Sequence, residues 1–362
     1  MQKVKRLVRI FQNNGLSRGF RANWDKVRFS NFAAGRATFL ETRFTASHIL
    51  FPVLSEQPEA FYTNGDDERL QILWARENGL QTQNLEQILL AQIEHHRTEV
   101  FYNLDPMRYG SAFVARLPSC VKKSICWRAA PSGTADLSKY DLVVGNFPSL
   151  LDYWRNKGCK AANFFPAHDP AMDAYASARR DDFDLIFIGG FSRHHLKRNE
   201  ALRAAASIPG IRSRLYLEDS RLTRLANALP FLPGLRSFRH PDEIRAIRDD
   251  PAYGRDAYAA FSRSRIVFNG AVDMAGGDRG NMRCFEATGC GAVLLTDAGR
   301  YPDGFVDGET MVTYSSVQQI PELAKRLLND TSLSTSIAKA GYAMVKARYS
   351  KERQWAAFQT LI

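Results

Sequence analysis

Apolar residues in the first half of the chain form short continuous runs between stretches with helical spacing. The runs predict strands at residues 48–54, 100–104, 124–127, 141–144 and 161–165, and the apolar spacing over residues 85–93 predicts a helix. Strands that read as continuous apolar runs, without alternating polar positions, indicate a sheet covered on both faces. The first half is therefore expected to hold a parallel sheet with helices on either side.

The second half shows a clearer alternation of strands and helices. The pattern predicts strands at 184–190, 214–217, 265–269, 292–296 and 311–314, and helices over 197–206, 282–288, 321–328 and 333–349. Such alternation is typical of doubly wound α/β sheets. A polar, proline-containing stretch over residues 165–182 is expected to be an exposed connection. We therefore predict an α/β fold of two doubly wound domains, residues 1–170 and 183–362.

Composition excludes several classes of protein. The chain has 362 residues, of which 45% are apolar and 24% charged, within the range of globular proteins and outside that of collagenous or disordered ones. It contains no apolar run of ~18 residues that could span a membrane. The charged start of the sequence does not resemble a signal peptide. The five cysteines show no zinc or redox spacing, which favours a reduced, cytoplasmic protein.

Positive charge is concentrated at the start of the sequence. The net charge is +11, and residues 1–50 hold ten Lys or Arg against two acidic residues, a net +8. Such a segment attracts phosphates, nucleic acid or the inner face of an anionic membrane, or it is a solvated basic surface without a partner. Because no nucleic-acid-binding motif accompanies the charge, nucleic acid is not expected as a partner.

A glycine turn with basic residues is the first candidate site. Gly189 and Gly190 close a predicted strand, and Arg193, Lys197 and Arg198 follow before or within the next helix. Glycines let the backbone approach a ligand closely, and a helix start presents unpaired N–H groups to an anion. The pattern G-x-G-x-x-G of dinucleotide sites is absent, which disfavours NAD. The alternative is an ordinary strand-to-helix turn with solvated charges.

A second glycine-rich loop, at residues 276–280, precedes the helix predicted from residue 282. Asp278 lies in this loop, and Asn281, Arg283 and Glu286 lie at or within the helix. Carboxylates beside such a loop can accept hydrogen bonds from sugar or ribose hydroxyl groups. Alternatively, Glu286 is a buried ion-pair partner of Arg283, three residues away.

These segments resemble the C-terminal half of nucleotide-sugar glycosyltransferases with the GT-B architecture, two Rossmann-like domains that face each other across a cleft. The likeness is strongest to the group of CgeB-type, spore-maturation-like proteins, and it covers about half the chain, residues 184–350. It rests on the block Asn281–Asp297, on Phe268-Asn269, on Phe305–Glu309, on Ile337–Gly341 and on the glycine turn at 187–198.

The resemblance implies that the C-terminal domain binds the donor and that the N-terminal domain binds the acceptor. Glu286 matches the glutamate that holds the donor ribose. Asp278 stands where many relatives carry a glutamate near the donor sugar. The remaining donor-binding candidates are the glycine turn, the three basic residues that match the diphosphate-binding region, and the start of the second helix: Gly189, Gly190, Arg193, Lys197, Arg198, Asn281 and Arg283.

No catalytic base is named from the sequence. His95, His96 and Asp105 of the N-terminal domain are available, but each also fits an ordinary structural or surface role. No metal site and no cofactor are expected beyond the nucleotide sugar itself. The adjacent aspartates do not occur in a metal-binding context and are interpreted as solvated: Asp66-Asp67, Asp181-Asp182 and Asp249-Asp250.

The predicted function is that of a metal-independent glycosyltransferase of glycan biosynthesis. It would move a sugar from a nucleotide diphosphate sugar to a cell-surface glycan, a lipid-linked glycan or a protein. The basic start of the chain suggests peripheral contact with an anionic membrane. Two alternatives stay open: a non-catalytic GT-B homologue that binds a glycan or a protein partner, and a nucleotide-sugar epimerase or hydrolase on the same fold.

Overall fold

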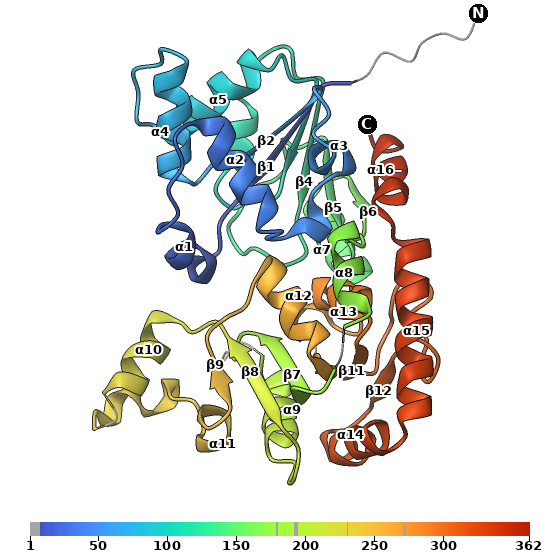
Figure 1. The fold of residues 1–362 in the computed structure, drawn as a ribbon. Helices are drawn as coiled ribbons and strands as arrows, with labels where there is room; N and C mark the ends of the chain where they lie inside the picture. Colours follow the sequence, from blue (N-terminus) through green and yellow to red (C-terminus); the bar gives the residue numbers. More distant parts are fainter. Residues whose placement is uncertain (1–7, 179, 192–194, 230, 271–272) are drawn as a thin grey trace, which may run out of the picture. The chain divides into compact units, whose positions relative to one another are not determined.

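The computed structural model describes residues 8–178, 180–191, 195–229, 231–270 and 273–362 (Figure 1). Arg193, one of the candidate residues, lies outside these ranges. The chain forms two compact units, Met1–Pro166 with Lys351–Ile362, and Ala167–Ser350. The last twelve residues thus pack with the first unit, whereas the sequence analysis placed them in a domain with residues 183–350.

The described part of the first unit contains a parallel six-stranded sheet in the order β2-β1-β3-β4-β5-β6. Its strands are β1 (Ile10–Asn14), β2 (Ala60–Asn64), β3 (Val100–Asn103), β4 (Lys123–Trp127), β5 (Leu142–Gly145) and β6 (Ala161–Asn163). Its helices are α1 (Arg18–Trp24), α2 (Phe32–Glu41), α3 (Phe51–Leu54), α4 (Glu68–Glu77), α5 (Leu85–His95), α6 (Ser111–Val114), α7 (Pro148–Asn156) and α16 (Lys351–Gln359).

The C-terminal helix α16 is fixed to the first unit by a buried lysine. Lys351 is 1% exposed. Its ammonium group donates hydrogen bonds to the carbonyls of Ala46 (2.6 Å) and Ile49 (2.7 Å) and to Oε1 of Gln354 (3.0 Å). Three acceptors match the three N–H donors of the lysine, so its buried charge is fully solvated by protein groups.

The described part of the second unit contains another parallel six-stranded sheet, in the order β12-β11-β10-β7-β8-β9. Its strands are β7 (Phe183–Gly189), β8 (Ser213–Leu217), β9 (Arg248–Asp249), β10 (Ser264–Phe268), β11 (Val293–Asp297) and β12 (Val312–Tyr314). Its α-helices are α8 (Asp173–Ala176), α9 (Leu196–Ala206), α10 (Arg221–Ala228), α11 (Asp242–Arg245), α12 (Gly254–Ser262), α13 (Met282–Gly289), α14 (Ile320–Asn329) and α15 (Thr331–Arg348).

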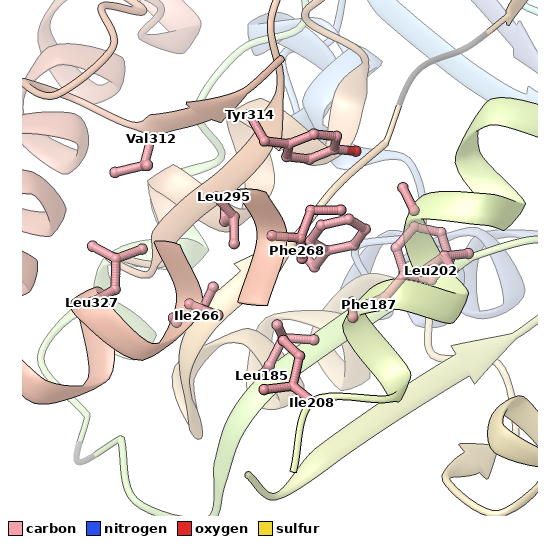
Figure 2. Close-up of a cluster of buried hydrophobic side chains, with 14 of the residues drawn as sticks. Leu185, Phe187, Leu202, Ile208, Ile266, Phe268, Leu295, Val312, Tyr314 and Leu327 are labelled. Atoms are coloured by element: carbon pink, nitrogen blue, oxygen red, sulfur yellow. The ribbon is translucent and has the colours of Figure 1, made fainter. Parts of the chain in front are cut away.

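One face of the second sheet packs against α9 and α14 (Figure 2). Leu185 of β7 and Ile266 of β10 are almost fully buried, together with Leu202 of α9. The rings of Phe268 and Tyr314 stack with their centroids 5.6 Å apart. Because this core fills the space beneath neighbouring strands, it fixes the positions at which the strands end and their loops begin.

The predicted strands and helices of the second half are confirmed, as are those of residues 85–165. The strand predicted at 48–54 is wrong, because residues 46–48 form a 3-10 turn and Phe51–Leu54 form α3. Pro52 lies in the first turn of α3, where proline, which has no N–H to donate, is well accommodated. The sequence analysis did not predict several strands and helices, among them β1, β2, α2, α4, α7, α10 and α12.

The interpretation of the aspartate pairs is wrong for one of the three. Asp66 and Asp67 are 7% and 1% exposed. Asp67 caps α4 by accepting a hydrogen bond from the Leu70 amide, and it also accepts one from the indole of Trp24 at 2.5 Å. The other pairs are exposed, as expected: Asp181-Asp182 and Asp249-Asp250.

Candidate functional site

The edge of the second sheet where the strands end is the first place to look for a ligand. In this sheet β8 lies on one side of β7 and β10 on the other, so the chain leaves the two central strands in opposite directions. Ligands of open α/β sheets bind at such a switch point, outside the carboxyl ends of the strands. The glycine turn follows β7 and the second glycine-rich loop follows β10, so both sequence candidates meet at this edge.

Arg198 of α9 is a half-buried cation of this edge. Its guanidinium carbon lies 6.0 Å from the ring centroid of Phe187, and a Cβ at Gly270 would lie only 2.7 Å from its Cγ. Burial lowers the pKa of Arg198 to about 10, although Asp273 opposes the shift. Arg198 therefore stays charged at neutral pH. Its Nε is buried and has no hydrogen-bond partner among the described residues.

The glycine turn itself closes tightly over β7. A Cβ at Gly189 would lie 2.7 Å from the Phe187 ring, and the Gly189 carbonyl accepts a hydrogen bond from the Glu218 amide at 2.9 Å. Gly190 has more room, since a Cβ there would come no closer than 3.9 Å to the Glu218 carbonyl. Lys197 is exposed at the start of α9. The start of α9 therefore carries an exposed cation, Lys197, next to the half-buried Arg198.

The start of α13 is held against the ends of β10 and β11. Asn281 caps the helix by accepting a hydrogen bond from the Arg283 amide at 3.0 Å. Its Nδ2 donates to Oδ1 of Asn269 at 3.1 Å, and Asn269 in turn donates to the Thr296 hydroxyl at 3.2 Å. The helix N-terminus, with its partial positive charge, is thereby fixed at the sheet edge.

Both candidate carboxylates are buried and paired with arginines. Glu286 is 2% exposed, and its Oε2 accepts a hydrogen bond from Nη1 of Arg283. Burial raises the pKa of Glu286 even though Arg283 opposes the shift. Asp278 is 1% exposed, with Nη2 of Arg300 at 2.7 Å from its Oδ1. The ion pair between Arg283 and Glu286 that the sequence left open as an alternative is thus present.

The sequence analysis missed two ion pairs that join the loops of this edge. Arg279 forms an ion pair with Asp297 at the end of β11, and Arg300 pairs with Asp278. Asp297 belongs to the block that carries the family resemblance, but nothing in its local pattern assigned it a role. Burial raises the pKa of Asp297, and Arg279 opposes that shift.

The first sheet has its own switch point, between β1 and β3, since β2 lies on the other side of β1. Asp105 follows β3, and a Cβ at Gly15, which follows β1, would lie 2.9 Å from its Oδ2. Nε of Arg108 lies 3.5 Å from the same oxygen. Burial raises the pKa of Asp105 despite the nearby Arg108 and Arg128.

Asp66, which follows β2, is the second carboxylate of this edge. It accepts hydrogen bonds from Nη2 of Arg21 at 2.5 Å and from the Leu16 amide at 3.1 Å. Burial raises its pKa, and the charge of Asp105 adds to the shift. Two buried carboxyl groups with raised pKa values at a switch point are a feature of functional sites as well as of structural networks.

A hydrogen-bonded network beneath Asp66 and Asp105 makes this edge rigid. Asn13 donates to Asn103 at 2.8 Å, and Asn103 donates to the Tyr140 hydroxyl at 2.7 Å. The Tyr109 hydroxyl donates to the Gly65 carbonyl at 2.6 Å. Because these side chains are buried and satisfied, the loops after β1, β2 and β3 keep one arrangement.

The remaining sequence candidates lie elsewhere. His95 packs against Trp74, and His96 lies against the ring of Phe61, where burial lowers the pKa of His96 to about 4. Among the described residues, no group of three or more His, Cys, Asp or Glu side chains is placed to hold a metal ion. In the same part of the chain, no helix has the length and apolar character needed to cross a membrane.

A cavity of about 610 Å³ lies at the opposite, amino edge of the second sheet, lined by Arg180, Arg265 and Tyr342 among others. Its arginines are committed to the backbone, since Arg180 donates to the Phe261 carbonyl at 3.0 Å and Arg265 to the Leu328 carbonyl at 2.5 Å. Lys339 is the exposed cation of its lining. The cavity lies at the amino ends of the strands, whereas ligands of open α/β sheets bind outside the carboxyl ends.

Comparison with known proteins finds one family whose model matches part of the chain. Residues 194–360 match the model of a family described as glycosyl transferase-like. No curated protein matches the sequence significantly. The match includes all of α9 and α13 but begins after the glycine turn with Gly189 and Gly190.

Solved structures of glycosyltransferases resemble the whole chain. HepE from Anabaena, in complex with UDP and glucose, is 13% identical over 98% of this chain and 99% of its own, with a TM-score of 0.58. A glycosyltransferase from Rickettsia africae is 10% identical over 98% of both chains, with a TM-score of 0.54. Sucrose-phosphate synthase from Thermosynechococcus elongatus is 12% identical over 98% of both chains, with a TM-score of 0.51. The chain thus has the GT-B fold, which confirms the predicted fold class.

Proposed function

We propose that the protein is a glycosyltransferase that moves a sugar from a nucleotide diphosphate sugar to an acceptor hydroxyl group. The observation that carries the proposal is the carboxyl edge of the second sheet, where the chain leaves β7 toward α9 with Arg198 and leaves β10 toward α13 with Glu286. Both residues lie within the segment that matches the glycosyl transferase-like family. Within that family we propose the CgeB-type group as the nearest relatives.

The cations of this edge suit a diphosphate leaving group. Breaking the bond between sugar and phosphate leaves negative charge on the nucleotide, and fixed positive groups lower the energy of that step. Arg198 offers a buried Nε without a partner among the described residues, Lys197 an exposed ammonium and α13 its N-terminal amides. Arg193, which the family resemblance also implicates, would add a further charge. With these groups the reaction needs no metal ion.

Glu286 keeps the capacity to bind a ribose although it is paired. Arg283 occupies one carboxylate oxygen, Oε2, and a carboxylate offers about four lone-pair positions in all. Hydroxyl groups of a ribose would donate hydrogen bonds to the remaining positions and stabilise the carboxylate, which opposes the rise in the pKa of Glu286 that burial causes. Asp278 is proposed to stand near the donor sugar, with Gly189, Gly190 and Asn281 shaping the backbone around the ligand.

Uridine diphosphate is the first nucleotide to test, because HepE was crystallised with UDP and with UDP-glucose. The acceptor is proposed to bind the first unit, at the edge that holds Asp66 and Asp105. Carboxylates and guanidinium groups together suit a hydroxyl-rich ligand, which fits a cell-surface or lipid-linked glycan. A glycosylated protein acceptor fits the same chemistry.

Calorimetric titration with UDP tests the donor site. Wild-type protein is expected to bind UDP, and Arg198→Gln and Glu286→Gln are expected to weaken binding by ~10-fold or more, since each removes a charge-assisted hydrogen bond. Two exposed residues of α14 supply matched controls, Arg326→Gln and Glu322→Gln, which should bind UDP like the wild type. Equal affinities for all five proteins would contradict the proposed donor site.

A time course with the bound nucleotide sugar separates a transferase from an epimerase or hydrolase. An epimerase or hydrolase converts the donor without an acceptor, whereas a transferase requires one for rapid turnover. Addition of EDTA is expected to leave turnover unchanged. Loss of turnover with EDTA and recovery with a divalent cation would refute the metal-independent mechanism.

A further inference from the structure

The helix α10 exposes its large apolar residues and buries its small ones. Leu222 and Leu225 are 45% and 46% exposed, whereas Thr223 and Ala226 are 8% and 0% exposed. The hydrophobic effect would favour the opposite orientation in a helix that only covers a core. The outward leucines therefore point to a partner outside this unit.

The turn after α10 extends the same apolar surface. Phe231 is 73% exposed and Leu232 is 38% exposed. Residues 220–240 thus contain four of the ten exposed large apolar side chains found in the described part of the chain. Single exposed apolar residues are ordinary, but a cluster of this kind marks an interaction site. We refer to residues 220–229 and 231–240 as the α10–η3 arm, since the 3-10 helix η3 (Pro233–Phe238) completes it.

The charge of the α10–η3 arm has a single sign. The arm holds four arginines and no aspartate or glutamate. Arg221, Arg224 and Arg236 are exposed beside the apolar side chains. A surface that combines leucines, a phenylalanine and arginines is complementary to the headgroups and upper acyl chains of anionic lipids.

The α10–η3 arm is a preformed structure. The guanidinium of Arg239 donates to the carbonyls of Ala226 (3.2 Å), Leu229 (3.4 Å) and Leu232 (2.7 Å). At the base of the arm, Nε2 of the buried His240 lies 2.6 Å from Oδ1 of Asp219. These contacts hold the turn after α10 in place, so the apolar surface does not result from fraying of the helix.

We propose that the α10–η3 arm docks the second unit on an anionic lipid surface. Leu222, Leu225 and Phe231 enter the interface between headgroups and acyl chains, and the exposed arginines contact lipid phosphates. The arm follows β8 and therefore starts from the carboxyl edge of the sheet, and Figure 1 shows α10 to the side of the sheet, next to β9. This inference does not depend on the transferase activity, because it concerns residues outside the proposed donor site.

Docking through the arm would also bear on the donor site. The ring of Phe191, next to the glycine turn, lies 5.3 Å from the ring of His240 at the base of the arm. Lipid contact would therefore hold the loop after β7 close to the membrane surface. A lipid-linked acceptor in the same membrane would then have a high effective concentration near the proposed donor site.

Cosedimentation with vesicles tests the proposal. The full-length protein is expected to bind vesicles made of equal parts of phosphatidylcholine and phosphatidylglycerol, and to bind pure phosphatidylcholine much more weakly. The double variant Leu222→Ser/Leu225→Ser should bind the anionic vesicles at least ~10-fold more weakly. Arg221→Gln/Arg224→Gln should lose most of the preference for anionic lipid.

Matched controls change the same residue types elsewhere on the second unit. Val306→Ser removes an apolar side chain that is 42% exposed, and Arg326→Gln removes an exposed arginine of α14. Both should bind vesicles like the wild type. UDP titration of the arm variants should give wild-type affinity, which shows that their donor site is folded and separates this test from that of the proposed function.

Three results would overturn the proposal. Equal vesicle binding by the wild type and the arm variants would do so, as would binding that is lost only when the basic N-terminal segment is neutralised, for example in Arg18→Gln/Arg28→Gln. The third is a wild type that is dimeric in solution while Leu222→Ser/Leu225→Ser is monomeric, because the apolar face would then be an interface between copies.

A tryptophan placed by Phe231→Trp should shift its emission to shorter wavelength when anionic vesicles are added, as expected for insertion of the arm.

Discussion

Burial opposes the ionisation of the Asp105 carboxyl group. Its side chain is 22% exposed, and burial raises its pKa although Arg108 lies 3.5 Å away. A carboxyl group with a raised pKa in the folded state contributes most to stability at low pH, and that contribution is lost as pH rises through the folded pKa. The carboxylate at neutral pH is therefore a cost to the fold, which is common where a charge serves function.

Asp105→Asn is accordingly expected to be more stable than the wild type at neutral pH. Urea unfolding measured from acid to neutral pH should show the difference growing as pH rises from the ordinary aspartate pKa through the raised one, because only the wild type pays for ionisation. The same variant should bind UDP normally and turn over donor more slowly with acceptor present. A variant that is less stable at neutral pH, with unchanged turnover, would assign Asp105 a purely structural role.

Single residues differ in how far their roles could be predicted from the sequence. Arg198 was found because a glycine turn and a helix start surround it in the sequence. Asp105 could be named only as one candidate base among several, since Gly15, which packs closely against its carboxyl group, is ninety positions away in the chain. The pairing of Asp278 with Arg300 was likewise invisible, because it joins loops after two different strands.

At the scale of elements, apolar patterning found the strands whose buried faces are apolar and missed those that bury polar groups. Strand β1 has the sequence Ile-Phe-Gln-Asn-Asn, and Gln12 and Asn13 are both 0% exposed. Gln12 donates to the His48 carbonyl at 3.2 Å and accepts from the Leu50 amide at 2.9 Å. Such buried polar positions are satisfied by distant residues, and a local pattern carries no sign of them.

Helix α16 offers a test of how one element is attached. Lys351 is buried and donates three hydrogen bonds, two of them to carbonyls 302 and 305 positions earlier in the chain. Lys351→Met leaves these acceptors without their donor and should lower the free energy of unfolding by about 3 kcal/mol. Lys346 of α15 is the matched control, because it pairs with Asp173 at 2.8 Å with half of its side chain exposed.

Lys346→Met should change stability by no more than ~1 kcal/mol, as is usual for exposed ion pairs. Urea denaturation followed by tryptophan fluorescence measures both variants, and limited proteolysis should show α16 detaching first in Lys351→Met. Equal losses in the two variants would mean that the buried hydrogen bonds contribute no more than a surface pair.

At the scale of the whole molecule, the sequence predicted two α/β units but not that the chain returns to the first one. The second unit ends at Ser350, and α16 then completes the core of the first unit, where Phe358 packs against Tyr102 and Phe164. The stretch at 165–182 does contain the boundary between the units, but the expectation of an exposed connection is wrong for its first part, where Ala167, His168 and Asp169 are buried and α8 follows. The return of the chain to the first unit was not predicted, because the sequence of residues 351–362 carries no local sign of the unit against which they pack.

This organisation predicts that a nucleotide stabilises the two units unequally. If the second unit alone binds UDP, UDP at ~100 times its dissociation constant should stabilise that unit by about 2.7 kcal/mol and the first unit by much less. Hydrogen exchange measured by mass spectrometry should then slow in the loop after β10 and in α13, and stay unchanged in the loops after β1 and β3. Protection confined to the loops of the first sheet would place the nucleotide there and reverse the proposed roles of the two units.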